Sequence, residues 1–233
     1  MKLKPRGRPD GEHLTVHAEL LCHFSPYYRV AIEGEFQEKG KDFFDVDAGR
    51  KALRMATTWM YTGKIVNIGD EDKHPSVPAL IALYVFADSY NFLALRRDLM
   101  SSLADMYRGK VPLYQEVTSA YDSLPSNSPL CRRMVACYVF HWSIGDDEES
   151  QEEEDRDSAP STFLSAVMAG REMQRDRNSN RKHNTECDCC VYVCEYHEHE
   201  SDEEWHASEF ALHQHVTNAD GSKACGRNGE QDG

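Results

Sequence analysis

The sequence has no long apolar run and no excess of basic residues. Its longest uninterrupted apolar stretch is the nine residues 79–87, whereas a helix needs about 20 to cross a bilayer. No apolar segment follows the basic N-terminus, so we expect no secretory signal there. A net charge of −14 makes the chain a poor ligand for a phosphate backbone. We therefore expect a cytosolic or nuclear protein that binds neither membranes nor nucleic acids.

The motifs that mark common catalytic sites are also missing. The sequence has no glycine-rich phosphate loop, no Gly-x-Ser-x-Gly elbow and no His-Glu-x-x-His helix. Neighbouring carboxylates are frequent only in the run 146–157. Water surrounds such a run, whereas acid–base catalysis needs carboxylates with perturbed pKa values. These features favour a protein without enzymatic activity.

Acidic residues are concentrated towards the C-terminus. Of the 26 Lys and Arg residues 18 precede position 146, and of the 40 Asp and Glu residues 17 do, which leaves 8 basic and 23 acidic residues after it. The run 146–157 contains nine acidic residues and no apolar one, so self-repulsion makes it a solvated linker. We expect an acidic linker over 146–160, a helix over 161–177 that uses Phe163, Val167 and Met168, and a Cys- and His-rich, mostly disordered tail over 178–233.

Apolar periodicity in the first 145 residues predicts strands first and helices later. Leu14 and Val16 alternate as in a half-buried strand, with Lys2–Lys4 as its hairpin partner. Further strands are predicted at Phe43–Val46 and at Ile65–Val66. Helices are predicted to begin at Ala18 and Pro26, the second capped by Ser25, and to cover 47–61 with Asp47 as cap, 76–90, 92–108, 112–121 and 129–142.

This order of elements predicts an α+β domain whose helices cover a small sheet. We expect the domain to span 1–110, with 111–145 as a helical extension packed on it. Helical spacing places Leu20 and Leu21 on one buried face and Trp59 on another. Leu99 lies in a third apolar stripe, which continues to Met106.

Several blocks of the sequence, in the same order, resemble the BTB/POZ family of interaction domains, and most closely its compact fungal members. The matching blocks are His17, Leu20-Leu21, Ser25-Pro26-Tyr27-Tyr28, Phe36-Gln37-Glu38, Trp59-Met60-Tyr61-Thr62-Gly63, Leu83-Tyr84-Val85-Phe86-Ala87-Asp88 and Leu95-Arg96. The resemblance implies a helical cluster capped by a small sheet. It also places His17 at the strand-to-helix turn, where we expect a half-buried imidazole bonded to backbone.

The resemblance implies association with other proteins, including a second BTB chain, and an adaptor role in a cullin-based ubiquitin ligase. In members that recruit cullins, a hydrophobic-x-Glu triplet after the second helix docks the cullin, and Phe36 and Glu38 match it. Packing of Phe36 onto the core explains the same triplet. A structural oligomeriser without a ligase link is a further alternative. The short stretch before Glu12 argues against the strand-exchanged dimer of many family members.

A dense group of soft metal ligands lies in the tail. Four cysteines and two histidines occur within 13 residues: Cys187, Cys189, Cys190, Cys194, His197 and His199. Thiolates and imidazoles are the ligands that zinc prefers, although structural zinc sites usually pair two separated knuckles. The sequence therefore leaves two interpretations, a zinc site and an ordinary acidic tail with free thiols. No other cofactor is expected.

Overall fold

The computed structural model of the protein describes residues 1–5, 13–34, 43–67, 74–143, 158–178, 190, 196–198, 214–217 and 223–226. The chain divides into two compact units, Met1–Leu99 and Met100–Gly233. The division falls inside one helix, α5 (Leu93–Met106), which contributes residues to both units. No helix within the described ranges combines the length and the apolarity that a membrane crossing requires.

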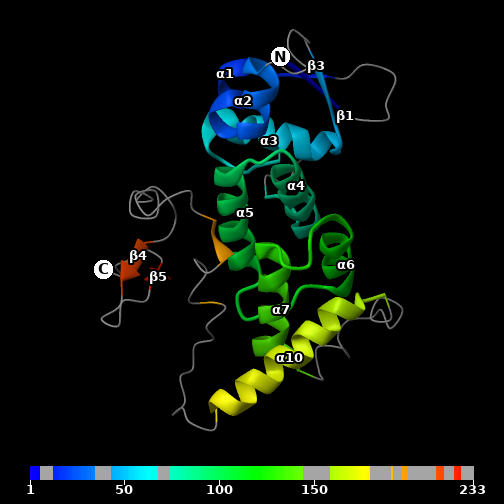
Figure 1. Ribbon diagram of the computed structural model, residues 1–233, viewed down its shortest axis with the longest axis vertical. Helices are drawn as coiled ribbons and strands as arrows, with labels where there is room; N and C mark the ends of the chain where they lie inside the picture. The colour runs from blue at the N-terminus through cyan, green and yellow to red at the C-terminus, as the bar shows by residue number, and fades with distance from the viewer. Residues whose placement is uncertain are drawn as a thin grey trace. The chain divides into compact units, whose positions relative to one another are not determined.

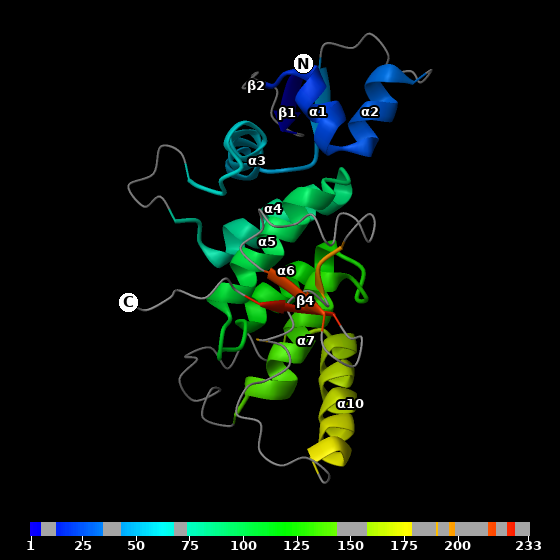
Figure 2. The ribbon, with the colours of Figure 1, turned by 90° about the vertical axis from the view of Figure 1, so that its left-hand side faces the viewer.

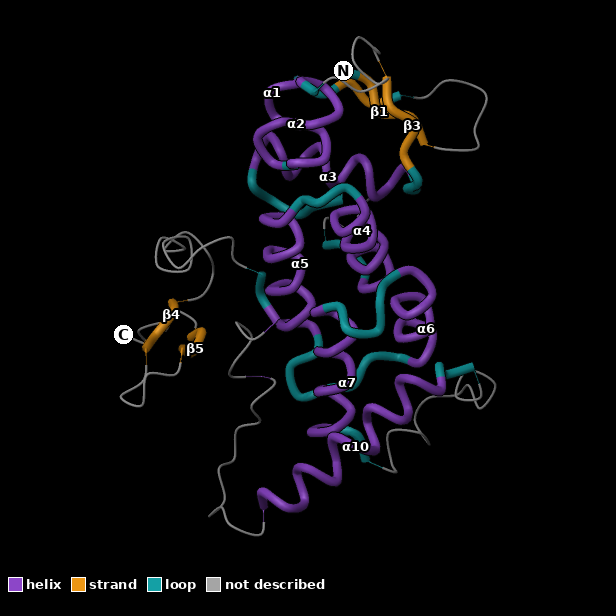
Figure 3. Tube along the Cα trace, in the orientation of Figure 1, coloured by secondary structure: helices purple, strands orange, loops and turns teal. Residues whose placement is uncertain are grey.

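The first unit contains a three-stranded sheet in the order β2-β1-β3. Figure 3 labels two of its strands, β1 and β3. Strand β1 (Lys2–Pro5) pairs antiparallel with β2 (Leu14–Thr15) and parallel with β3 (Phe43–Val46). The register pairs Leu3 with Leu14 and with Phe44, and the side chain of Leu3 is completely buried. The hairpin predicted between the chain start and the second strand is therefore confirmed, and together with the helices it makes an α+β fold.

The helices of this unit begin and end largely where the sequence predicts. They are α1 (Ala18–Phe24), α2 (Pro26–Glu33), α3 (Arg50–Thr62), α4 (Val77–Ser89) and the first part of α5. Ser25 caps α2 because its hydroxyl accepts from the Tyr28 N–H at 3.1 Å, and the same hydroxyl donates to the Tyr90 carbonyl at 2.6 Å. Gly63 ends α3 in the left-handed region, with φ of 67°.

The core of the first unit is aromatic and aliphatic. Helix α4 is apolar nearly all round and is expected to be covered on all sides, but Pro78, Ala82 and Ser89 form an exposed stripe along it. Rings from α2, β3, α4 and the α4–α5 turn contact one another at centroid distances between 5.1 and 5.9 Å: Tyr28, Phe44, Phe86, Tyr90 and Phe92. Leu21, Trp59 and Leu99, which the sequence assigns to the core, are buried, and the Trp59 Nε1–H donates to Asp98 at 2.8 Å.

Two predictions of secondary structure in this unit are wrong. Helix α3 is capped by Gly49 rather than Asp47, whose backbone N–H instead donates to the Tyr90 hydroxyl at 2.8 Å. Ile65 and Val66 form no strand. Two β-branched residues do not specify a strand unless a neighbouring edge pairs with them, because β-propensity largely reflects packing against such neighbours.

The second unit contains the rest of α5 together with α6 (Tyr114–Ser123), α7 (Pro129–His141) and α10 (Ser161–Asn178), the last matching the helix predicted over 161–177. Helices α7 and α10 lie side by side in both views (Figures 1 and 2). They approach closely at Gly170, where a Cβ atom would lie 2.6 Å from Val139 Cγ2. Strands β4 (Gln214–Thr217) and β5 (Lys223–Gly226) form an antiparallel pair that the sequence does not predict.

An aromatic contact joins α10 to the other helices of this unit. Phe163 is completely buried, and its ring lies edge-on to Tyr121 of α6 and to Tyr138 of α7. Two apolar residues expected on buried stripes are exposed instead, Met168 by 73% and Met106 by 39%. Met168 follows Phe163 by five positions, which places it about 140° around α10 from that buried residue. Met106 is the last residue of α5 and is exposed although it shares a helix face with the buried Leu99.

Candidate functional site

The predicted docking triplet lies outside the described residues. Phe36 and Glu38 fall between α2 and β3, in the undescribed range 35–42. The structure describes the helix before this range and the strand after it. The candidate surface is therefore built from α2 and β3, the two elements that flank the triplet in the chain.

Helix α2 presents two apolar side chains to solvent. Tyr27 is 46% exposed and Val30 is 52% exposed, three residues further along the helix. Spacing of three places two residues on the same helix face, and Tyr28 and Ala31 fill the buried side of α2. We call Tyr27 and Val30 the α2 face. A tyrosine beside an aliphatic residue is a composition that interfaces favour.

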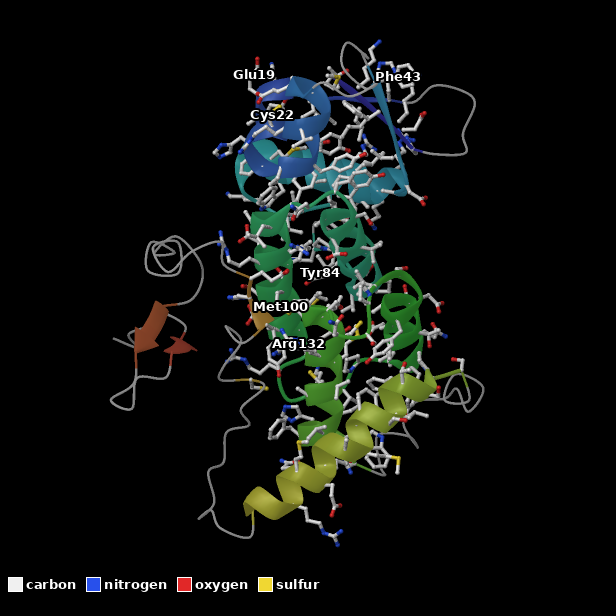
Figure 4. The ribbon with its side chains drawn as sticks, viewed as in Figure 1. Glu19, Cys22, Phe43, Tyr84, Met100 and Arg132 are labelled. Atoms are coloured by element: carbon white, nitrogen blue, oxygen red, sulfur yellow. The ribbon has the colours of Figure 1, made fainter. Side chains whose placement is uncertain are left out.

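The α2 face rests on fixed neighbours. The Tyr27 ring meets the Tyr28 and Tyr90 rings edge-on, with centroids 5.2 and 5.4 Å apart. Next to it in sequence, the Arg29 Nε–H donates to the Cys22 carbonyl at 2.9 Å and ties α2 to α1. Figure 4 labels Cys22 on α1 and Phe43 on β3. The Lys4 ammonium lies 3.8 Å from the centre of the Phe43 ring and so covers part of that residue.

His17 is not a core residue, which corrects the sequence prediction. It is the N-cap residue of α1 and is exposed, and its Nδ1 lies 2.6 Å from the Tyr61 hydroxyl. The backbone at a cap position is extended, which turns this side chain towards the end of α3 rather than into the core. Leu20, also expected in the core, is only half-buried, because Leu21 and Cys22 form the buried face of α1 instead.

A buried carboxylate lies at the start of α6. Glu116 Oε2 accepts from the Tyr107 hydroxyl and from the Leu113 N–H, both at 2.9 Å. Burial raises the pKa of Glu116, and the two hydrogen bonds partly counter that shift. Burial and the adjacent Glu116 raise the pKa of Tyr107 as well. This arrangement is half of a capping box and fixes the entry of α6.

The described part of the tail packs against α5 and α7 of its own unit. His197 is 9% exposed, and its Nε2 lies 3.1 Å from Ser101 Oγ on α5. The Tyr196 ring centre lies 5.9 Å from the guanidinium of Arg132 and 5.5 Å from that of Arg133, both on α7 (Arg132 is labelled in Figure 4). Arg133 is almost completely buried and donates to the Ala104 carbonyl at 3.4 Å.

The Ser101–His197 distance resembles that of a nucleophile and its base. Both side chains are buried, however, with Ser101 only 4% exposed. A substrate therefore has no direct access to the hydroxyl in this arrangement, and the contact is better explained as an anchor for the tail. Neither this serine nor the arginine pair is marked by any motif in the sequence.

A second tail contact involves a predicted metal ligand. Cys190 Sγ lies 3.2 Å from Nε2 of His141, the last residue of α7. Burial and the nearby Arg133 lower the pKa of the His141 imidazole. The other predicted ligands Cys187, Cys189, Cys194 and His199 lie outside the described residues. Among the described residues, no three His, Cys, Asp or Glu side chains converge as a metal site would require.

Comparison with known proteins does not assign the chain to a family, so any assignment depends on its own residues. No known protein family matches the chain, and no curated protein matches it either.

Proposed function

We propose that this chain is a non-enzymatic protein-interaction module of the BTB/POZ type. Its role is to bind partner proteins in the cytosol or nucleus and to present them to a cullin-based ubiquitin ligase. The proposal begins with the ordered sequence blocks that resemble the family.

The positions of these blocks on the fold support the proposal. Ser25-Pro26 starts α2, the block 59–63 ends α3, and the block 83–88 lies within α4. Each of these three blocks thus coincides with an element boundary or a largely buried helix, where a fold constrains its sequence most strongly. An α+β unit with a small sheet followed by helices is also the architecture that the resemblance implies.

The α2 face is the observation on which the proposal chiefly rests. Tyr27 and Val30 are exposed on the helix that directly precedes Phe36 and Glu38 in the chain. Interface hot spots are typically aromatic anchors ringed by weaker contacts. A docking surface made of the α2 face and the Phe36–Glu38 triplet has this composition, with one carboxylate to select a basic partner group.

The proposal is tested by measuring binding of the full chain to a cullin N-terminal domain by calorimetry. We expect the double variant Phe36→Ala/Glu38→Ala to lose binding, and Tyr27→Ala to weaken it by at least about tenfold, the effect of a hot-spot residue. Met168→Ala is the matched control, because it also removes an exposed apolar side chain but lies on α10. Circular dichroism verifies that each variant is folded.

Two results would overturn the ligase link. Either the wild-type chain fails to bind the cullin domain, or the double variant binds as tightly as the wild type. A solution mass measurement on the same samples then addresses the alternative function. Self-association that is unchanged in the double variant would identify a structural oligomeriser instead.

A further inference from the structure

We infer that the surface formed by α5 and α7 is a binding site for an acidic peptide in which an aromatic residue precedes a histidine. The protein's own tail, through residues 196–198, occupies this site in the structure. We call Ser101 of α5 together with Arg132 and Arg133 of α7 the α5–α7 site. The inference does not depend on the proposed function, because every residue in it belongs to the second unit.

The histidine of the tail is buried in the α5–α7 site. His197 is 9% exposed, and its Nε2 lies 3.1 Å from Ser101 Oγ, although the two residues are 96 positions apart in the chain. A buried polar side chain keeps its place only where hydrogen bonds satisfy it. The Ser101 hydroxyl donates or accepts, so it pairs with either tautomer of a neutral imidazole. The site therefore selects a histidine at this position over an apolar side chain.

Two guanidinium groups contact the aromatic ring that precedes the histidine. The Tyr196 ring centre lies 5.9 Å from the Arg132 guanidinium and 5.5 Å from that of Arg133, within the distance of about 6 Å at which a ring attracts a cation. Arg133 also donates to the Ala104 carbonyl of α5 at 3.4 Å, a contact between the helices that does not involve the tail. Part of the site is therefore built without its occupant.

The charge of the tail complements that of α7. Helix α7 contains two arginines and no acidic residue, and Arg132 is exposed. Residues 195–204 of the tail include six acidic residues and neither Lys nor Arg. Complementary charge speeds the encounter of two partners and disfavours partners of the wrong sign. A peptide that binds this site is therefore acidic as well as carrying the aromatic–histidine pair.

A tail on the same chain competes with any peptide that arrives from solution. Tethering presents residues 196–198 to the site at an effective concentration of up to about 1 mM. The apparent affinity for an external peptide equals the intrinsic affinity multiplied by the fraction of chains whose site is free. An acidic partner with the same residue pair therefore binds by displacing the tail, and loss of the two tail side chains should favour it.

The test measures peptide binding to the full chain by fluorescence anisotropy. The probe is a labelled peptide with the sequence of residues 195–204, which contains no cysteine. We expect it to bind the double variant Tyr196→Ala/His197→Ala at least about tenfold more tightly than the wild-type chain, because the variant no longer fills its own site. A control peptide in which alanines replace the tyrosine and the first histidine should bind neither chain.

Substitutions within the site show where the peptide binds. In the double variant, the further change Arg132→Ala should weaken binding by about five- to tenfold, because it removes one cation from the ring. Ser101→Ala should weaken it by a similar factor through the lost hydrogen bond. Arg175→Ala is the matched control, because Arg175 is an arginine of α10 whose side chain is 82% exposed. Arg132 is exposed, so its replacement preserves the fold even if Ser101→Ala does not.

Each arm of this experiment can contradict the inference. If the peptide does not bind the double variant, α5 and α7 form no peptide site. If it binds the wild-type chain equally well, the tail does not occupy the site in solution. If Arg132→Ala weakens binding no more than Arg175→Ala does, or if the control peptide binds as tightly, general charge attraction and not the aromatic–histidine pair holds the peptide.

Discussion

The two units of this protein bury different kinds of side chain. In Met1–Leu99 the buried polar residues of the described ranges, Ser25 and Asn67, are neutral, and packed rings and aliphatic chains fill the core. In Met100–Gly233 an arginine, a glutamate and a histidine are buried among the helices: Arg133, Glu116 and His197. Burying a charge is costly unless specific partners satisfy it.

The difference shows two ways of specifying a fold. An aromatic core tolerates substitutions that keep its volume, because dispersion and apolar burial are non-directional. A buried ionisable group instead demands one partner in one place, as Glu116 does with Tyr107. Among the described residues, substitution of a buried ionisable group should therefore have its consequence in the second unit, whereas the core of the first unit depends mainly on shape.

The largest expected effect tests whether apolar packing still dominates in the second unit. Phe163→Ala should lower the free energy of unfolding by about 3–5 kcal/mol, because it empties a fully buried position. Met168→Ala, on the exposed side of the same helix, should change it by less than about 0.5 kcal/mol. Urea denaturation measures both. Equal effects would mean that α10 is not packed as described.

A prediction of intermediate size concerns the loss of unfolding free energy when a helix cap is removed, with one cap taken from each unit. Ser25 and Ser128 both cap helices, but Ser25 also donates to the Tyr90 carbonyl. Ser25→Ala should therefore cost about 2 kcal/mol and Ser128→Ala about 1 kcal/mol, at about 1 kcal/mol per hydrogen bond. Denaturation of the two variants under the same conditions gives the comparison. A larger loss for Ser128→Ala would contradict it.

The smallest expected effect is a pH dependence of the unfolding free energy. It tests the difference in buried ionisable groups between the two units. The pKa of Glu116 is raised above 4.5, chiefly by burial, so the folded state binds this proton more tightly than the unfolded state. Protonation of Glu116 therefore stabilises the folded state. This contribution to the free energy of unfolding is complete below pH 4.5 and is lost as pH rises through the pKa of Glu116 in the folded state. The stability advantage of wild type over Glu116→Gln should therefore shrink as pH rises above about 4.5.

Tyr107→Phe provides the matched control for this prediction. The Tyr107 hydrogen bond lowers the pKa of Glu116, so its removal should raise that pKa further and widen the pH window. The pH dependence of the unfolding free energy should thus be weaker than wild type in Glu116→Gln and stronger than wild type in Tyr107→Phe. A pH dependence that Glu116→Gln leaves unchanged would remove Glu116 as its source.

The first unit is largely predictable from sequence because its signals are local. Ser25-Pro26 marks the start of α2 through a cap and a proline only one residue apart. Gly63 marks the end of α3 in the same way. The exposed position of His17 is not predictable in this manner, since its partner Tyr61 lies 44 residues further along the chain.

The candidate sites of the second unit depend on contacts between distant residues. Arg133 lies among the apolar residues of α7 and is buried with them. Apolar periodicity does not predict this burial, because it places charged residues on the solvent side of a helix. Its burial depends on the Ala104 carbonyl and on the Tyr196 ring, which follows 63 residues later. The Ser101–His197 contact spans 96 residues. Ligand type alone identifies Cys190, but only the fold brings it to His141.

The close approach of α10 to α7 bears on the order in which the chain acquires its structure during synthesis. Gly170 lies in the middle of α10, where glycine weakens an isolated helix by about 1 kcal/mol relative to alanine. The missing Cβ is what allows Val139 to come so near. A helix weakened in this way gains its stability from docking. We therefore expect α10 to leave the ribosome as unstructured chain and to form a helix only when it packs against α7.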